Sequence, residues 1–348
     1  MERKLVTVRK ISKIEDIPGA DVIQVVTVDG WKVVVRKGEF QEGEYVVYFE
    51  IDSALPEKDK RYAFLMKNGV REFDGGKIHR LRTVKLRGQI SQGLILPLNT
   101  FPEITKTLDG GCGKSNSKWM ESGFQELLGI KKYEAPIPAC LAGQVKGAFP
   151  SIVPKTDEER IQNIGYLWGQ MDDTEFEISE KLDGTSATFG IHNDEFVVCS
   201  RNLNLCESDS NTYWKVARKF KIEESLRSEG LTELFIQGEI VGEGIQNNLY
   251  KIKGQTLYVF SMYDAKLGKY LSPFERVEIC DKLKLQHVPI IGVKKLSEVG
   301  RSTDEVLNFA DGPSLLNPQT IREGVVFKEV NDQTHFKAIS NKFLLKFE

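Results

Sequence analysis

Short runs of β-branched and aromatic residues, separated by turn residues, fill the first hundred or so positions of the chain. The runs VIQVVTV and WKVVVRK flank Asp29-Gly30, a pair typical of a tight hairpin turn between two strands. No helical period interrupts this pattern. Residues 1–100 are therefore predicted to form an all-β domain, and an OB-like barrel of five strands has the size that fits.

From about residue 149 onward, strand and helix patterns mix. EFEISEKL and SATFGIH alternate apolar and polar positions as strands do, whereas NTYWKVARKFKIEESL has a helical period that turns Trp214 inward. A second helix is predicted to begin at SPFERVEICDKLKL, with Ser272 as its N-cap. The pattern predicts an α+β domain of mostly antiparallel sheets at residues 149–348, and residues 101–148 are predicted to be a connector.

The composition suits two folded domains and gives no overall charge signal. Of the 348 residues, 40% are hydrophobic, and 48 basic against 50 acidic residues leave a net charge of −2. The sequence contains no run of ~18 apolar residues, the length that spans a membrane. The start MERKLVTVRK lacks the apolar stretch of a secretory signal. We therefore expect an intracellular protein, cytoplasmic or nuclear, without a membrane partner.

Positive charge is concentrated locally between residues 77 and 100, a stretch that contains no acidic residue. Strand alternation distributes these charges over both faces of the predicted strands. Two interpretations stay open: a solvated strand pair, or a surface that contacts nucleic-acid phosphates. The candidate nucleic-acid-binding residues are Arg80, Arg82, Lys85 and Arg87.

One short segment carries the candidate chemistry. In EISEKLDGTS, residues 177–186, an alternating strand ends at Lys181 and is followed by Asp183 and Gly184. A lysine at a strand end that faces a cleft can have its pKa lowered by burial and by neighbouring cations, and the neutral amine is a nucleophile. Attack on the α-phosphorus of a nucleotide would expel pyrophosphate and leave a phosphoramidate, which divides one hard condensation into easier steps.

The sequence Lys181-Leu182-Asp183-Gly184 resembles the K-x-D-G signature of the covalent nucleotidyltransferases, the superfamily of ATP-dependent ligases and mRNA capping enzymes. Further segments follow in the order of that superfamily's motifs, and the ordered set carries the resemblance. They are Ser200-Arg201-Asn202, LFIQGEIVGEG around Glu239, YVFSMYD around Phe260, Arg322-Glu323-Gly324-Val325-Val326-Phe327-Lys328, and His335-Phe336-Lys337-Ala338.

The resemblance implies a role for each matched residue. Lys181 is the expected catalytic nucleophile, which carries AMP in a covalent intermediate. ATP and a Mg²⁺ or Mn²⁺ ion are the expected cofactors, since such an ion needs few carboxylates besides phosphate oxygens and waters. The expected ATP-binding residues are Glu180, Arg201, Glu239, Phe260, Lys328 and Lys337, and the expected metal ligands are Glu323, Glu239 and Asp183.

The segment PKTDEERIQN, residues 154–163, resembles a stretch that RNA ligases carry ahead of the nucleophile. Two interpretations stay open for it. Either Lys155 or Arg160 binds the triphosphate of ATP, or the segment is the charged start of a helix, where acidic residues are favourable in the first turn.

The order of the two domains resembles the RNA ligase class with an N-terminal OB domain, whereas DNA ligases and capping enzymes usually carry theirs after the nucleotidyltransferase domain. This resemblance implies an ATP-dependent RNA ligase that transfers AMP from Lys181 to a 5′-phosphate end and joins that end to a 3′-hydroxyl. The implied partner is RNA, or an RNA-containing duplex, in nick sealing and RNA repair. We expect the protein to act as a monomer.

Three other functions compete with this interpretation. A capping-type guanylyltransferase would form Lys-GMP, and a DNA ligase would not depend on ribose at the 3′-hydroxyl end. An OB-fold nucleic-acid-binding protein with a vestigial catalytic half would usually have lost one of the motif residues. The sequence retains all of them, which favours an active enzyme.

Overall fold

The computed structural model describes residues 3–109, 122–134, 143–331 and 333–347. Contacts divide the chain into two compact units, each described here by itself. The first comprises Met1–Pro136, Gln162–Gly165 and Leu344–Glu348, and the second comprises Ile137–Ile161 and Tyr166–Phe343. The boundaries predicted at residues 100 and 148 stay a prediction.

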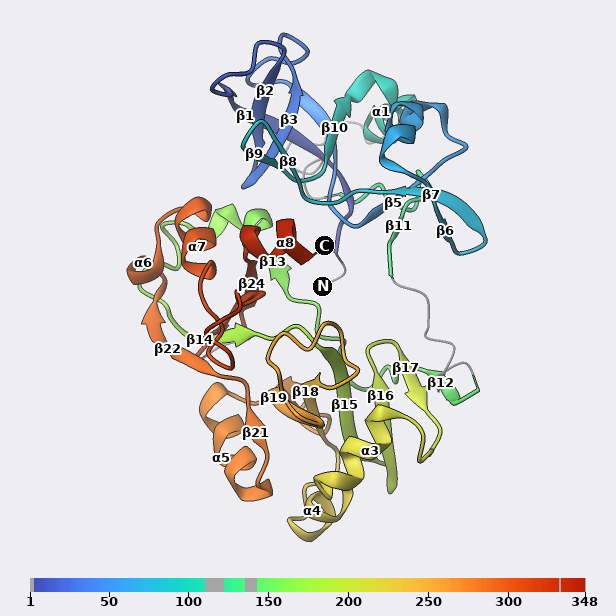
Figure 1. Cartoon of the computed structure of the whole chain (residues 1–348), viewed down its shortest axis with the longest axis vertical. Coiled ribbons are helices and arrows are strands. Elements are labelled where there is room, and N and C mark those ends of the chain that lie inside the picture. The colour runs from blue at the N-terminus through green and yellow to red at the C-terminus, as the bar shows by residue number, and fades with distance from the viewer. Residues whose placement is uncertain (1–2, 110–121, 135–142, 332, 348) are drawn as a thin grey trace. The chain divides into compact units, whose positions relative to one another are not determined.

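The first unit is built on short antiparallel strands (Figure 1). Its five-stranded sheet has the order β10-β4-β1-β2-β3, and a second sheet has the order β11-β5-β7-β6. The strands are β1 (Val6–Asp16), β2 (Ile23–Val28), β3 (Trp31–Arg36), β4 (Tyr45–Phe49), β5 (Ser53–Pro56), β6 (Arg71–Phe73), β7 (Gly76–Arg80), β8 (Val84–Leu86), β9 (Gln89–Ser91), β10 (Leu94–Pro97) and β11 (Lys131–Lys132). The predicted all-β, OB-like architecture is confirmed.

The predicted hairpin around Asp29 is present. Val28 pairs with Trp31 across it, and Asp29 has the positive φ of 48° that a two-residue hairpin turn requires. Beside β3 lies the β8–β9 hairpin, whose Ser91 hydroxyl accepts a hydrogen bond of 2.9 Å from the Val34 amide. Short helical segments complete the unit: η1 (Lys60–Asn68), η2 (Leu98–Thr100) and α1 (Pro102–Asp109).

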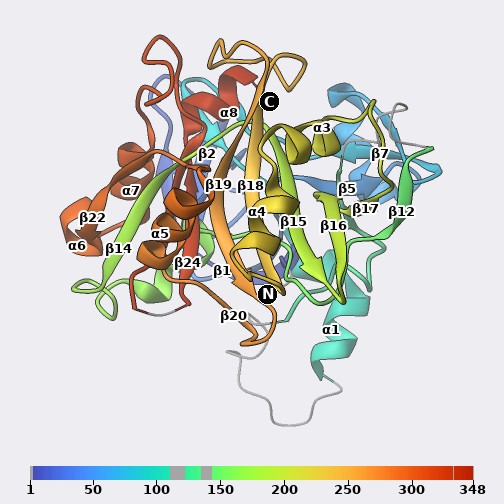
Figure 2. The same ribbon diagram turned by 90° about the horizontal axis from the view of Figure 1, so that it is seen from below.

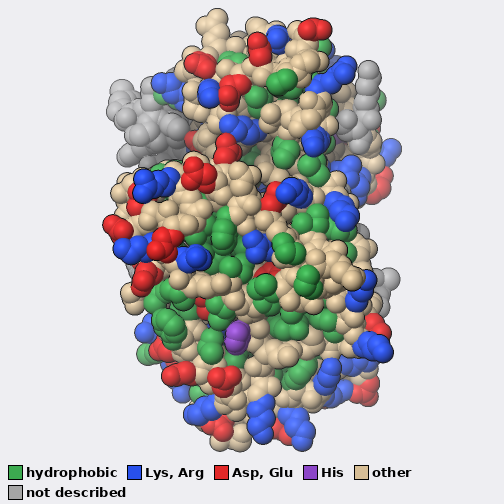
Figure 3. Space-filling model, turned by 60° about the vertical axis from the view of Figure 1, so that its left-hand side comes forward, with side chains coloured by type: hydrophobic (Ala, Val, Ile, Leu, Met, Phe, Trp, Pro, Cys, Tyr) green, Lys and Arg blue, Asp and Glu red, His purple; other side chains and the backbone are tan. Residues whose placement is uncertain are grey.

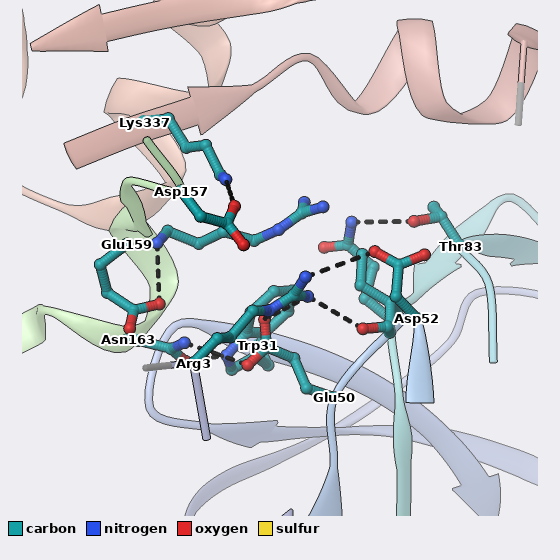
Figure 4. A network of polar contacts seen from close by, with 12 residues as sticks. Arg3, Trp31, Glu50, Asp52, Thr83, Asp157, Glu159, Asn163 and Lys337 are labelled. Atoms are coloured by element: carbon teal, nitrogen blue, oxygen red, sulfur yellow. Dashed lines mark hydrogen bonds and ion pairs between the residues drawn. The ribbon is translucent and has the colours of Figure 1, made fainter. Parts of the chain in front are cut away.

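A segment distant in sequence belongs to this first unit. The Trp31 indole donates a 2.6 Å hydrogen bond to the side-chain oxygen of Asn163, and the Asn163 amide donates one of 3.2 Å to Glu50 (Figure 4). Glu50 is 1% exposed and also pairs with Arg3 at 2.6 Å. These bonds satisfy a buried carboxylate and fix residues 162–165 to the barrel strands.

The second unit contains two sheets that are almost entirely antiparallel (Figures 1 and 2). The larger has the order β12-β17-β16-β15-β18-β19-β20, with β21 added parallel to β19, and the smaller has the order β13-β24-β23-β14-β22. The strands are β12 (Val145–Ala148), β13 (Glu159–Arg160), β14 (Glu175–Lys181), β15 (Thr185–His192), β16 (Glu195–Ser200), β17 (Leu203–Leu205), β18 (Leu234–Gly242), β19 (Gln255–Asp264), β20 (Lys269–Tyr270), β21 (Gln286–His287), β22 (Ile290–Lys295), β23 (Gly324–Glu329) and β24 (His335–Ile339). The predicted α+β domain of mostly antiparallel sheets is confirmed.

Helices cover the sheets of this unit. They are α3 (Thr212–Lys219), α4 (Ile222–Ser228), α5 (Pro273–Leu283), α6 (Leu296–Val299) and α7 (Thr303–Ala310). Three further helices, η4 (Ile161–Asn163), η5 (Gly165–Leu167) and α8 (Asn341–Phe347), each contain residues of both units. Ser272 caps α5 in a capping box, as predicted. The single helix predicted over NTYWKVARKFKIEESL is wrong, because Lys221 adopts a left-handed conformation (φ 51°, ψ 40°) that separates α3 from α4.

The described helices include none that is long and apolar enough to cross a membrane.

Candidate active site

Lys181 lies where the two sheets of the second unit meet. It is the last residue of β14 in the smaller sheet, and β15 of the larger sheet begins at Thr185. The three residues between them, Leu182–Gly184, carry the chain from one sheet to the other. Tyr250 fixes this crossing, because its hydroxyl accepts a 2.6 Å hydrogen bond from the Asp183 amide.

Close strand packing explains the two motif glycines. A Cβ added to Gly184 would collide with the carbonyl oxygen of Ile240 and lie 2.9 Å from Cγ of Glu239, both on β18. A Cβ added to Gly324 would collide with the carbonyl oxygen of Ala338 on β24. Glycine at these positions therefore allows the strands that carry Glu239 and Lys337 to approach the nucleophile.

Three lysines expected in the site share one face of the smaller sheet. Lys181 pairs with Gly324, and Val326, two residues along β23, pairs with Lys337 on β24. Lys328 follows two residues later on the same strand. Directly paired residues lie on the same face of a sheet, and so do alternate residues of a strand. The fold thus brings together residues that are up to about 150 positions apart in sequence.

Carboxylates surround the Lys181 amine. Its Nζ lies 2.6 Å from Oε1 of Glu323, and only 27% of the lysine side chain is exposed. Burial acts to lower the pKa of Lys181, but the negative charges of Glu323 and Glu239 outweigh burial, so the pKa is raised. The sequence-based expectation of a pKa lowered by burial and neighbouring cations is therefore wrong, because carboxylates and not cations lie nearest to the Lys181 amine.

Glu239, Glu323 and Asp183 are close enough to influence one another electrostatically. Burial raises the pKa of Glu239 to about 8, and the charges of Glu323 and Asp183 add to that rise. Within the described residues, no three acidic, histidine or cysteine side chains converge into a ready-made metal cluster. Mg²⁺ usually keeps several waters and takes only one or two carboxylates besides substrate phosphates, so this loose carboxylate set fits such an ion.

Cationic groups line the other side of the site. Lys337, whose side chain is 10% exposed, donates a 2.8 Å hydrogen bond to Asp157 (Figure 4). Arg201 lies 3.6 Å from the other oxygen of the same carboxylate. Lys328 donates to the Ser261 hydroxyl at 2.5 Å and to the Phe260 carbonyl. Burial lowers the pKa of both Lys328 and Lys337 to about 8.

Residues 154–158 belong to no helix or strand, and β13 follows them. The interpretation of the segment as a helix start is therefore wrong. Lys155 donates a 3.1 Å hydrogen bond to Asn202, the neighbour of Arg201. Arg160 is 5% exposed and pairs in register with Lys337, which places both candidate triphosphate-binding residues beside the cationic groups.

Glu180 faces away from Lys181, toward an apolar cluster. Its Oε2 accepts a 2.6 Å hydrogen bond from the Leu315 amide, whereas Oε1 is buried and has no hydrogen-bond partner among the described residues. The cluster contains buried Leu182, Val241, Tyr250 and Val288, with Tyr258, Phe260 and Leu316 partly buried against it. An apolar slot beside an unused buried acceptor fits a purine that carries an amino group.

The basic stretch of the first unit does not form one surface. Arg80 is held by Asp52 at 2.8 Å and lies over the Tyr133 ring at 4.6 Å, whereas Arg82, Lys85 and Arg87 are exposed around β8. On the face of the molecule in Figure 3, basic and acidic side chains are interspersed. Of the four candidate residues, Arg82, Lys85 and Arg87 are therefore the exposed ones.

Several residues of the site had no signal in the sequence. The sequence pattern indicates no role in the site for Asp157, Glu158 or Tyr250. Glu158 is half-buried; burial acts to raise its pKa, but Lys337 and Lys328 outweigh burial and lower it. Glu158, Phe260 and Lys328 line one cleft together with His335. Periodicity reports which face a side chain takes, and it carries no information on such distant partners.

Comparisons with known proteins agree with this site. A family model described as an OB-fold domain matches residues 5–98, and one described as RNA ligase matches residues 174–346. A solved mutant of Naegleria gruberi RNA ligase in the apo form is 41% identical, covers 98% of this chain and 97% of its own, and has a TM-score of 0.89. A structure of that ligase with PPi is 41% identical, covers 99% of this chain and 98% of its own, and has a TM-score of 0.88. A structure of a mutant with ATP and Mn is 41% identical, covers 98% of this chain and 97% of its own, and has a TM-score of 0.87. The search of curated proteins found no match.

Proposed function

Because this chain belongs to the RNA ligase family, we propose that it is an ATP-dependent RNA ligase that acts through an AMP adduct on Lys181. ATP and a divalent ion such as Mn²⁺ or Mg²⁺ are its proposed cofactors, in agreement with the Naegleria gruberi ligase structure that contains ATP and Mn. An active ligase also accounts for the intact motif set better than a capping guanylyltransferase or a vestigial enzyme does.

One observation carries this proposal: Lys181 stands between an acidic and a basic group of side chains. Glu323 and Glu239 lie on one side, and Lys337, Lys328 and Arg201 supply donors on the other. A nucleoside triphosphate with its metal ion presents the complementary charges. Its phosphates fit the basic side and its ion fits the acidic side.

In the first step, Lys181 attacks the α-phosphorus and pyrophosphate leaves. The ammonium has to lose a proton first, and Glu323, at 2.6 Å from Nζ, accepts its hydrogen bond. A divalent ion near Glu239, Glu323 and Asp183 would neutralise the carboxylates that keep this proton in place and would polarise the phosphate. Lys337 and Lys328 donate to phosphate oxygens as their charge develops.

The adenine base is assigned to the apolar cluster beneath Glu180. The 6-amino group of adenine can donate to the buried Oε1 of Glu180, whereas the 6-oxo group of guanine has no hydrogen to donate to it. Phe260 is the proposed stacking residue, being partly buried against this cluster. The site therefore selects ATP over GTP.

The later steps are proposed from the family. AMP passes to a 5′-phosphate end, and a 3′-hydroxyl then attacks to form the phosphodiester, as in nick sealing and RNA repair. We assign the exposed Arg82, Lys85 and Arg87 to contacts with the phosphates of an RNA-containing duplex. All proposed groups around Lys181 come from one chain, which is consistent with a monomer.

The decisive test is nucleotide labelling. Incubation with α-labelled ATP and Mg²⁺ or Mn²⁺ should attach label to the protein, and label from GTP should not. Lys181→Ala should abolish labelling and leave the circular dichroism spectrum unchanged, because the lysine side chain is partly exposed. The matched control is Lys266→Ala, which removes an exposed lysine of the same unit.

End specificity is tested by sealing. Nicked duplexes that differ only in a ribose or deoxyribose at the 3′-hydroxyl end should be sealed at different rates, with ribose preferred. Equal rates on both nicks would favour a DNA ligase. Labelling by GTP in place of ATP would favour the guanylyltransferase and contradict the assignment of Glu180.

A further inference from the structure

The site contains an anion of its own, the carboxylate of Asp157. One of its oxygens lies 2.8 Å from Nζ of Lys337 (Figure 4). The other lies 3.6 Å from Nη2 of Arg201. Lys337 belongs to β24 of the smaller sheet, whereas Arg201 follows β16 of the larger sheet. A single carboxylate therefore joins two cations that come from different sheets.

A phosphate group bound in this site would make the same contacts. Lys337 and Arg201 are both assigned to the nucleotide, and two carboxylate oxygens have a spacing similar to that of two phosphate oxygens. Two anions repel each other at this distance, and each cation has a limited number of donors. The carboxylate and a nucleotide phosphate therefore compete for Lys337 and Arg201.

The segment that carries Asp157 is anchored on both sides of this contact. On one side, Gln237 of β18 donates a 2.9 Å hydrogen bond to the Pro154 carbonyl, and Lys155 donates to Asn202. On the other side, β13 pairs with β24. Residues 154–158 belong to no helix or strand of the described chain, so no strand or helix pairing has to break for the Asp157 carboxylate to leave the two cations.

From this geometry, and on the basis of the function proposed above, we infer that Asp157 is an internal competitor of the nucleotide phosphates. It neutralises Lys337 and Arg201 while the site holds no nucleotide, and it leaves them when ATP binds. Part of the binding free energy of ATP is used to break these two contacts. Pyrophosphate bound at the same cations meets the same competition, so Asp157 weakens the binding of pyrophosphate as well.

The test is Asp157→Asn, which keeps the shape of the side chain and removes its charge. Labelling rates are measured at varied ATP concentration in wild type, in Asp157→Asn and in Asp157→Ser. We expect KM for ATP to fall about tenfold in both variants, which corresponds to ~1.4 kcal/mol. Inhibition of labelling by added pyrophosphate should become stronger by a similar factor, since the same cations are released.

A matched control removes a carboxylate that pairs with a lysine away from the site. Asp173 contacts Lys295 at 3.1 Å and is 90% exposed, so Asp173→Asn should leave KM and pyrophosphate inhibition unchanged. An unchanged or raised KM in the two Asp157 variants would overturn the inference. A loss of kcat alongside it would mark Asp157 as a residue that positions Lys337. Wild type that is never labelled by ATP would instead contradict the proposed function.

Discussion

The buried ion pair between Glu177 and Arg276 offers the sharpest test of the energetics of the second unit. Both Nη atoms of Arg276, on α5, donate to the carboxylate of Glu177 on β14 at 2.9 and 2.8 Å. The side chains are only 2% and 3% exposed. Glu177→Gln removes the negative charge at nearly constant volume and leaves the guanidinium buried without its counter-ion.

The expected loss of stability follows from this burial. Breaking a buried pair by removing one partner costs about 3–5 kcal/mol, and the lower end applies here because the glutamine oxygen still accepts one hydrogen bond. For a unit of about 200 residues, each kcal/mol lowers the melting temperature by roughly 2–4 °C, so we expect a fall of about 6–12 °C. Calorimetry of the full chain measures it and separates the transitions if the two units unfold independently.

Two further variants make this reasoning refutable. Asp173→Asn breaks the exposed pair with Lys295 and should leave the melting temperature unchanged. The double variant Glu177→Leu/Arg276→Met removes both charges and should be more stable than Glu177→Gln, since the penalty comes from the unpaired charge. A fall of less than about 2 °C in Glu177→Gln, or a double variant that is less stable than the single one, would refute the argument.

Three other predictions concern the reaction. The pKa of Lys181 is raised, whereas the pKa values of Lys328 and Lys337 are lowered to about 8. We therefore expect kcat/KM for ATP in the labelling reaction to rise with pH as Lys181 loses its proton, and to fall above about pH 8 as the two lysines proposed to bind phosphate lose theirs. A flat profile from pH 6 to 10 would contradict this expectation. Gly184→Ala should lower the free energy of unfolding by about 1–3 kcal/mol and reduce labelling, because its Cβ would collide with Ile240. The control is Gly147→Ala, which has open space around it and should change neither measurement. Glu180→Gln should lower kcat/KM for ATP by about ten- to a hundredfold and reduce the ratio of kcat/KM for ATP to that for GTP. An unchanged ratio would contradict the assignment of Glu180 to the base site.

Local patterns in the sequence predicted much of the fold. Alternating β-branched residues identified β2, β3, β14 and β15, and the Asp-Gly pair identified the first hairpin, because these signals depend only on neighbouring residues. The break between α3 and α4 escaped prediction. Lys221 has no residue-type signal for its left-handed conformation, which tertiary packing imposes on an otherwise helical pattern.

The chemistry of the site could be predicted only in part, for a related reason. The motif resemblance supplied the identities of Lys181, Glu323 and Lys337, and register in the smaller sheet places the two lysines on one face. The direction of the Lys181 pKa shift depends on carboxylates from β18 and from the residue before β23. A sequence pattern cannot weigh those distant charges against burial.

Charge balance links the separate contacts of the site. Lys181 is paired with Glu323, and Lys337 and Arg201 share Asp157, so each of these cations already has an anionic partner. ATP alone would bring phosphates to the basic side but leave the carboxylates around Lys181 facing more negative charge. A divalent ion alone would neutralise those carboxylates but leave Lys181 as a cation beside it. Only ATP and the divalent ion together would give each of these cations and carboxylates a new partner of opposite charge. The binding of the ion and the binding of ATP therefore depend on each other. In the proposed reaction, the Lys181 amine, which must become neutral to attack, would stay protonated until ATP and the divalent ion are both bound.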